Sequence, residues 1–177
     1  YEKLIDCYEA ADKPFFCFNV TMQNHAGYED DGGLADKVTA DVQGEVKTPL
    51  ENYLTLLHES DKALEYLISY FETVEEPTVI LFVGDHQPML GRVFYEEEFK
   101  KSEQDFSIED ITHMYEIPYL IWANFPLNMD DAPAETSMNY LSEILFSVAG
   151  IERTPWMEML AEYRREYPIV TSNFMRQ

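Results

Sequence analysis

The sequence has few basic residues and no long apolar run. Only 12 lysines and arginines stand against 34 aspartates and glutamates, which gives a formal net charge of −22. A surface this acidic repels phosphate backbones, so nucleic-acid binding is strongly disfavoured, and so is docking on anionic lipid headgroups. An anionic substrate would need a metal ion or a local basic pocket. No stretch approaches the roughly 18 apolar residues of a membrane-spanning helix, and no charged-then-apolar leader opens the chain.

Cysteine is also scarce, and two cysteines do not make a disulfide framework. Cys7 falls in a predicted helix and Cys17 in the middle of a predicted buried strand, so both are expected to be free thiols in the core. The 177 residues correspond to about one domain, and 46% hydrophobic residues indicate a folded rather than a disordered chain. The direct start at Tyr1 suggests a piece of a longer protein.

The most informative motif is Gly84-Asp85-His86, which follows the apolar run 78–83. Side chains at the carboxyl end of a buried strand face the crevice where α/β proteins bind ligands, and a glycine there permits a sharp turn. Carboxylate oxygen and neutral imidazole nitrogen are both good ligands for a divalent cation. The structural alternative is an aspartate that caps a helix beside a hydrogen-bonded histidine.

A second apolar run, residues 14–22, predicts another buried strand and ends in Gln23, Asn24 and His25. Two strands therefore deliver imidazoles to their carboxyl ends. If both strands lie in one parallel sheet, His25, Asp85 and His86 should converge at one edge of it, within the width of a small-ligand cleft.

The remaining sequence alternates helical and strand-like segments. Helices are predicted at residues 2–12, at 48–73 with Thr48 as N-cap, at about 138–149, and from a second N-cap at Thr154 to before Pro168. Strands are predicted at 117–123 and 170–174, and a long surface loop at 26–47. Long connections between strands predict parallel pairing with right-handed crossovers. The fold class is therefore expected to be α/β, a mainly parallel sheet flanked by helices.

Three polar residues are expected to have no catalytic or metal-binding role. Asp61 interrupts the apolar stripe of the 48–73 helix, so it should need a hydrogen-bond partner on a buried face. His58 and His113 are expected to lie on the surface.

Six motifs, in order, resemble the lipoteichoic acid synthase and phosphoglycerol transferase group of the sulfatase and alkaline phosphatase superfamily. They are Lys13-Pro14-Phe15-Phe16, Thr21-Met22-Gln23-Asn24-His25, Glu59-Ser60-Asp61-Lys62-Ala63-Leu64, Pro77-Thr78-Val79-Ile80, Gly84-Asp85-His86-Gln87-Pro88 and Ile121-Trp122-Ala123-Asn124. The likeness runs from about residue 12 to the end of the chain. It implies a partial alkaline-phosphatase-like domain.

The resemblance implies a threonine nucleophile activated by a divalent cation: manganese, magnesium or zinc. Asp85 and His86 match two of the metal ligands, and His25, with Asn24 beside it, matches a substrate-pocket position. The resemblance implies that the longer protein acts on an anionic phosphoglycerol lipid at the extracellular face of a bacterial cell membrane. A region outside this chain would anchor that protein in the membrane. Oxidation there leaves a bridge between Cys7 and Cys17 open.

The family's nucleophile and its remaining metal carboxylate match nothing in this chain, and Thr21 does not occupy the nucleophile position. Residues 1–177 are therefore expected to form a C-terminal portion of a catalytic domain, inactive alone, that self-associates through an exposed edge.

Two alternatives stay open at this point. A sulfatase or phosphodiesterase of the same superfamily would pass the cleaved group to water instead of an acceptor. A non-catalytic acidic α/β interaction module would keep the fold without the activity.

Overall fold

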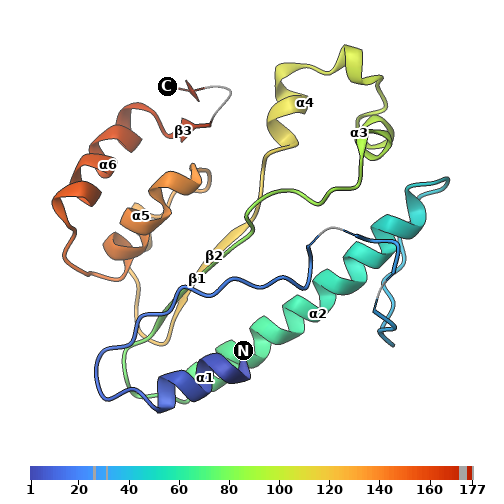
Figure 1. Ribbon diagram of the computed structural model, residues 1–177. Helices are drawn as coiled ribbons and strands as arrows, with labels where there is room; N and C mark the ends of the chain where they lie inside the picture. The colour runs from blue at the N-terminus through green and yellow to red at the C-terminus, as the bar shows by residue number, and fades with distance from the viewer. Residues whose placement is uncertain (26, 31, 172–174, 177) are drawn as a thin grey trace. The chain divides into compact units, whose positions relative to one another are not determined.

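The computed structural model describes residues 1–25, 27–30, 32–171 and 175–176. The chain divides into two compact units (Figure 1). Unit 1 comprises residues 1–73 and 83–118, and unit 2 comprises residues 74–82 and 119–177. Every residue that the sequence predicts for the metal and substrate site lies in unit 1.

Two helices form the base of unit 1. Helix α1 (Glu2–Glu9) packs on helix α2 (Lys47–Phe71), and the rings of Tyr8 and Phe71 meet edge to face at 5.1 Å between centroids. The apolar stripe of α2 buries Leu64 and Leu67. Both helices confirm the predicted segments, with different ends: α2 begins after Val46, and no side chain caps it.

Two details of α2 differ from expectation. Thr48 is not the N-cap, because the helix already includes Lys47 and so places Thr48 and Pro49 within its first turn, where backbone amides need no intrahelical acceptor. Asp61 is exposed instead of buried, so it needs no structural partner. His58 is exposed, as predicted.

Residues 14–22 do not form the predicted strand. The segment carries no strand assignment, and its alternate apolar side chains face solvent: Phe16 is 86% exposed, Phe18 83%, Val20 66% and Met22 64%. The period of two is a sound signal for extended backbone, but a strand also needs a neighbour to complete its hydrogen-bond ladder. Cys7 and Cys17 are free, as predicted, but both are exposed and neither is a core residue.

The exposed apolar side chains of residues 14–22 should drive concentration-dependent self-association of the 177-residue chain. An extended apolar segment with unpaired backbone groups is a template for pairing with another chain, and salt should strengthen the effect by screening the charge of −22. The measurement is sedimentation velocity at rising concentration and ionic strength. Phe16→Ser with Phe18→Ser should keep the chain monomeric, while Ile108→Ser, which removes an apolar side chain 82% exposed outside this segment, should not. A monomeric wild type in high salt would contradict the prediction.

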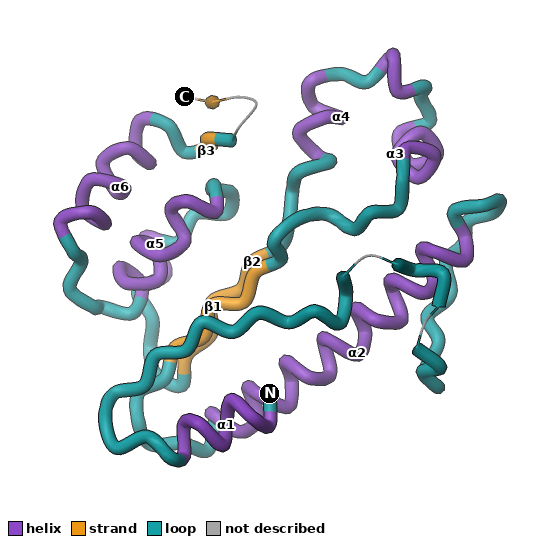
Figure 2. The backbone as a smooth tube through the Cα atoms, viewed as in Figure 1, coloured by secondary structure: helices purple, strands orange, loops and turns teal. Residues whose placement is uncertain are grey.

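The sheet also differs from expectation, because β1 (Val79–Val83) and β2 (Tyr119–Ala123) pair antiparallel. At one end the Gly84 amide donates to the Pro118 carbonyl oxygen at 3.4 Å, and at the other the Asn124 amide donates to that of Thr78 at 3.2 Å. The predicted parallel crossover is therefore wrong. Residues 84–118 leave and return at the same end of β1, which makes the two strands a hairpin with a long insert. Figure 2 shows how little of the described chain is strand.

That insert contains short helices: α3 (Arg92–Phe99), the 3-10 turn η1 (Glu103–Asp105) and α4 (Ile108–His113). Helix α4 has a complete capping box, in which the Ser107 hydroxyl accepts from the Asp110 amide and the Asp110 carboxylate accepts from the Ser107 amide at 2.7 Å. Lys101 Nζ lies 2.6 Å from the same carboxylate.

The start of α4 should therefore be acid-sensitive in a defined window. The Lys101 ammonium, and after it the bonds from Ser107, lower the pKa of Asp110 from 3.8 to about 2. A depressed pKa stabilises the fold above the ordinary value, and this contribution is lost as the pH falls through about 2. An NMR titration of the Asp110 carboxyl carbon should show the low midpoint, and Lys101→Met should raise it. A midpoint unchanged by Lys101→Met would contradict this assignment.

Unit 2 is built around two helices, α5 (Leu141–Val148) and α6 (Pro155–Glu166). Thr154 caps α6, as predicted, and accepts from the Met157 amide at 3.3 Å. Ile144 and Val148 of α5 are fully buried. The remaining elements are η2 (Met129–Asp131), η3 (Met138–Tyr140), β3 (Ile169–Val170) and β4 (Met175–Arg176). Strands β3 and β4 pair antiparallel, and residues 172–174 of the predicted 170–174 strand lie outside the described residues.

A charged cluster joins α5 to α6. The Glu143 carboxylate is completely buried, accepts from Arg164 Nε and lies 3.1 Å from Arg153 Nη2. The Arg153 contact is within ion-pair distance, but Glu143 Oε2 has no aligned hydrogen bond. Arg164 is therefore the directional partner of this buried carboxylate.

Candidate functional site

The Gly84-Asp85-His86 turn directly follows β1 and orients its two side chains toward each other. His86 Nδ1 lies 2.8 Å from the Gln87 carbonyl oxygen. Because a carbonyl oxygen can only accept, Nδ1 carries a proton in this contact. The other ring nitrogen, Nε2, lies 3.6 Å from Asp85 Oδ2. Both side chains are exposed, Asp85 by 85% and His86 by 58%.

The turn is fixed at its base by the strand that returns beside it. The Gln87 side-chain amide donates to the Glu116 carbonyl oxygen, and a Cβ added at Gly84 would make ordinary contacts with Ile117 at 3.7 Å. Gly84 is not among the glycines with positive φ, so the bend at Asp85 and His86 does not require the left-handed conformation that favours glycine. What positions Asp85 and His86 is the hairpin closure, not the conformational freedom of glycine.

The turn that carries His25 is anchored to α2. Gln23 Nε2 donates to the Leu56 carbonyl oxygen at 3.1 Å, and the Ser60 hydroxyl donates to Asn24 Oδ1 at 3.1 Å. The His25 amide donates to the Met22 carbonyl oxygen at 3.1 Å, and His25 is exposed. The side-chain oxygen of Asn24 therefore binds Ser60 of α2. The sequence had predicted that Asn24 contributes to the substrate pocket.

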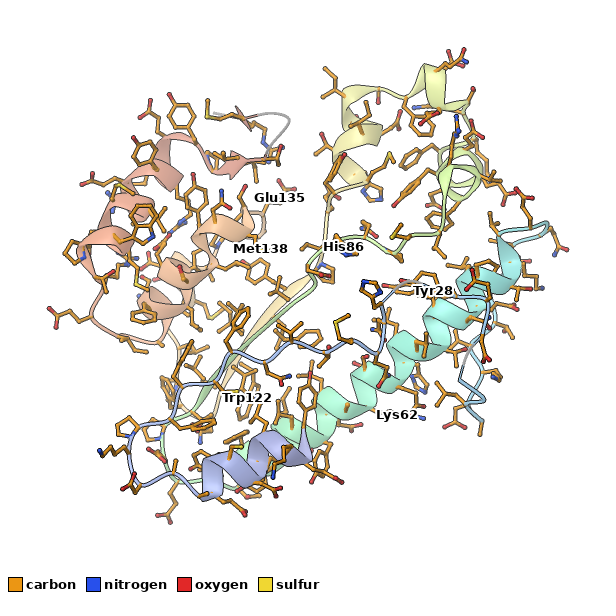
Figure 3. The ribbon with its side chains drawn as sticks, in the orientation of Figure 1. Tyr28, Lys62, His86, Trp122, Glu135 and Met138 are labelled. Carbon is orange, nitrogen blue, oxygen red and sulfur yellow. The ribbon has the colours of Figure 1, made fainter. Side chains whose placement is uncertain are left out.

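Tyr28 is a buried residue close to the His25 turn, and the sequence did not single it out. Its hydroxyl donates to the Asn24 carbonyl oxygen at 2.8 Å, and its own carbonyl oxygen accepts from Asn52 Nδ2 of α2 at 2.8 Å. Figure 3 labels Tyr28, and it labels His86 of the Gly84-Asp85-His86 turn. The one available signal was a large aromatic in an otherwise polar loop.

The other histidine near this region behaves as a surface residue, as predicted. His113 Nδ1 lies 2.7 Å from Glu116 Oε2, and both side chains are more than half exposed. Among the described residues, no group of three or more histidine, cysteine, aspartate or glutamate side chains could hold a metal ion. In the same described ranges, no helix is both long and apolar enough to cross a membrane.

The donor set of Asp85 and His86 fits one side of a divalent-cation site. A histidine that ligates a metal almost always donates its other ring N–H to a carbonyl or carboxylate, as His86 Nδ1 does to Gln87. This fixes Nε2 as the nitrogen with the free lone pair, facing a carboxylate oxygen. Two protein ligands do not complete a site, so further ligands must come from elsewhere.

The chain belongs to the sulfatase family, whose model matches residues 1–151. It is similar to a Rhizobium meliloti protein named for cyclic beta-1,2-glucan modification, at 28% identity over 66% of this chain and 19% of the relative. It is also similar to phosphoethanolamine transferase EptA of Helicobacter pylori, at 28% identity over 64% of this chain and 21% of the relative. The chain thus spans about a fifth of these curated relatives.

A solved structure shares the fold. Streptococcus pyogenes phosphoglycerol transferase GacH, in complex with sn-glycerol-1-phosphate, superposes with a TM-score of 0.59 over 88% of this chain and 38% of that one, at 22% identity. The chain therefore has the fold of part of a sulfatase-like domain, although the described strands pair antiparallel.

Proposed function

We propose that this chain is the C-terminal portion of the catalytic domain of a metal-dependent transferase. The parent enzyme takes the phosphoglycerol headgroup of an anionic membrane lipid at the extracellular face of a bacterial membrane and passes it to an acceptor. The observation that carries this proposal is the geometry of the Asp85–His86 pair. His86 Nδ1 donates its hydrogen to the Gln87 carbonyl oxygen, and His86 Nε2 faces Asp85 Oδ2 at 3.6 Å.

Each residue has a defined task in this proposal. Asp85 Oδ2 and His86 Nε2 hold a divalent cation, manganese, magnesium or zinc, which when bound neutralises charge on the phosphoryl oxygens. His25, exposed on a turn anchored to α2, hydrogen-bonds the phosphate or protonates the departing oxygen, and Asn24 keeps that turn in place. The threonine nucleophile and the remaining ligands belong to a part of the parent outside this chain, so residues 1–177 alone are inert.

Two similarities support group transfer from a phosphate ester. EptA is named as a phosphoethanolamine transferase, and the GacH structure is that of a phosphoglycerol transferase with glycerol phosphate bound. The EptA similarity makes phosphoethanolamine the second candidate headgroup. An excess of acidic residues does not itself attract an anionic lipid, so the cation is needed for substrate binding as well as for chemistry.

The test uses the full-length protein that contains this chain, purified in detergent and given fluorescent phosphatidylglycerol or phosphatidylethanolamine. We expect release of fluorescent diacylglycerol from phosphatidylglycerol in the presence of Mn²⁺ and none with EDTA. Release from phosphatidylethanolamine alone would favour the second headgroup and overturn the first. Stoichiometric free glycerol phosphate would identify a hydrolase. Failure to process either lipid with Mn²⁺, Mg²⁺ or Zn²⁺ would overturn the proposal and favour a non-catalytic module.

A further inference from the structure

Ser60 of α2 contacts both of the residues that precede His25. Its hydroxyl donates to Asn24 Oδ1 at 3.1 Å, and Gln23 Nε2 approaches the same hydroxyl oxygen at 3.5 Å. A serine hydroxyl has one proton to donate and lone pairs that accept, so it can bind both side chains at once. Gln23 also donates to the Leu56 carbonyl oxygen at 3.1 Å, about one helical turn before Ser60. The residues before His25 are therefore fastened to one face of α2.

The residues after His25 are fastened to the same helix through Tyr28. Tyr28 is only 5% exposed, and Asn52 Nδ2 donates to its carbonyl oxygen at 2.8 Å. Its ring meets that of Tyr53 edge to face at 5.3 Å between centroids. The Tyr28 hydroxyl donates to the Asn24 carbonyl oxygen at 2.8 Å. Both sides of the His25 turn thus rest on α2, and Asn24 is held at its side chain and at its carbonyl group.

Ser60 belongs to the Glu59-Ser60-Asp61-Lys62 motif, to which the proposed function gives no task. Lys62, labelled in Figure 3, forms ion pairs with Glu59 at 2.7 Å and with Asp36 at 2.5 Å. The Lys62 and Asp36 side chains are 39% and 68% exposed, and solvent-exposed pairs of this kind stabilise a fold only weakly. Ser60 is therefore the member of the motif that bears directly on the His25 turn.

We propose that Ser60 is a positioning residue, whose hydroxyl holds Asn24 and Gln23 on α2 and thereby sets the place of the His25 imidazole. This inference rests on the proposed function, in which His25 hydrogen-bonds the phosphate or protonates the departing oxygen. Ser60 acts through His25 and has no chemical step of its own. The placement matters because a catalytic group displaced by about 1 Å can lose on the order of a hundredfold in rate.

The first experiment tests the anchor itself in the 177-residue chain, without metal or substrate. Ser60→Ala removes only the hydroxyl group, and alanine favours a helix at least as well as serine. Ser69→Ala is the matched control, because Ser69 is an exposed serine of the same helix.

The reporter is the His25 amide, which closes the turn by donating to the Met22 carbonyl oxygen at 3.1 Å. Hydrogen exchange followed by NMR should show this amide exchanging roughly three- to tenfold faster in Ser60→Ala, the loss expected for one hydrogen bond. In Ser69→Ala it should exchange at the wild-type rate. An unchanged rate in Ser60→Ala would overturn the inference.

The second experiment tests the positioning role in the full-length protein, with fluorescent phosphatidylglycerol and Mn²⁺. Ser60→Ala should lower kcat for headgroup release by roughly 10- to 100-fold. The Mn²⁺ concentration for half-maximal rate should stay within about twofold, because the metal-binding pair Asp85 and His86 is untouched. Ser60→Thr, which keeps a hydroxyl, should retain most of the rate, and Ser69→Ala should retain all of it.

A double variant separates positioning from general stability. If Ser60 acts only through His25, adding Ser60→Ala to His25→Ala should cause no further loss of kcat. A merely structural role would lower the melting temperature and leave kcat of the folded enzyme unchanged, or would add its loss to that of His25→Ala, and either result would contradict the inference. If the wild type releases no headgroup with any cation, the proposed function fails and the positioning role fails with it, whereas exchange of the His25 amide still reports whether Ser60 holds the turn.

Discussion

Replacing Asp85 with alanine in the full-length protein is expected to lower headgroup release by about 10³-fold or more, and His86→Ala should do the same. A bound cation supplies several kcal/mol of stabilisation to a transferring phosphoryl group, and each 1.36 kcal/mol corresponds to a tenfold change in rate. Asp85 Oδ2 and His86 Nε2 are the pair that faces a common point, 3.6 Å apart. The double variant should lose little more than either single variant, because the two ligands act as a unit.

His113→Ala is the matched control for this experiment. His113 is a histidine of the same exposure, 59% against 58% for His86, and it also contacts a nearby carboxylate, Glu116 at 2.7 Å. It should leave activity and metal dependence unchanged. Isothermal titration with MnCl₂ would supply a second measurement: the site should weaken in Asp85→Ala and persist in His113→Ala. Equal rates for Asp85→Ala and the wild type would exclude the metal assignment.

Glu143→Ala is expected to lower the free energy of unfolding of unit 2 by about 3–5 kcal/mol. It leaves the largely buried guanidinium group of Arg164 without its counter-charge, and it leaves Arg153 only the exposed carboxylate of Glu158 at 4.0 Å. Arg164→Ala should approach the same loss, and Arg153→Ala should lose less. The reason is that Arg164 makes the directional hydrogen bond to Glu143, while Arg153 is only within ion-pair distance.

The measurement can be made specific to unit 2, because both tryptophans of the chain, Trp122 and Trp156, lie in it. Urea unfolding followed by tryptophan fluorescence therefore reports this unit. The control is Glu135→Ala, which breaks an ion pair to Arg176 that is 2.6 Å long but more than half exposed at both ends. Exposed pairs contribute about 0–1 kcal/mol, so its loss should be small. An equal loss in the free energy of unfolding for Glu143→Ala and Glu135→Ala would show that burial does not determine how much these ion pairs stabilise unit 2.

Local signals in the sequence predicted most helices correctly. The Thr154-Pro155 start of α6 and the apolar spacing of α2 depend only on residues within a few turns, and the structure confirms both elements. The placement of Gly84-Asp85-His86 directly after a strand is confirmed for the same reason. The assignment of Asp85 and His86 to a metal and of His25 and Asn24 to a substrate stays a prediction.

Long-range pairing could not be obtained from the same signals. The alternation of Phe16, Phe18, Val20 and Met22 is that of a strand, yet nothing in residues 14–22 specifies a neighbour. The direction of β2 relative to β1 depends on where a 35-residue excursion returns, which is a property of the whole insert. Tyr28 was missed because its burial depends on contacts with α2, such as the hydrogen bond from Asn52, 24 positions away.

The closure of the β1–β2 hairpin at Gly84 and Pro118 also has an evolutionary and engineering consequence. A segment whose two ends are hydrogen-bonded neighbours, here 3.4 Å apart, can grow, shrink or be exchanged without shifting the register of the strands that carry it. The helices α3 and α4 are thus a replaceable module grafted beside Asp85 and His86. Homologous enzymes could change what they recognise by exchanging this module while retaining the turn that precedes it.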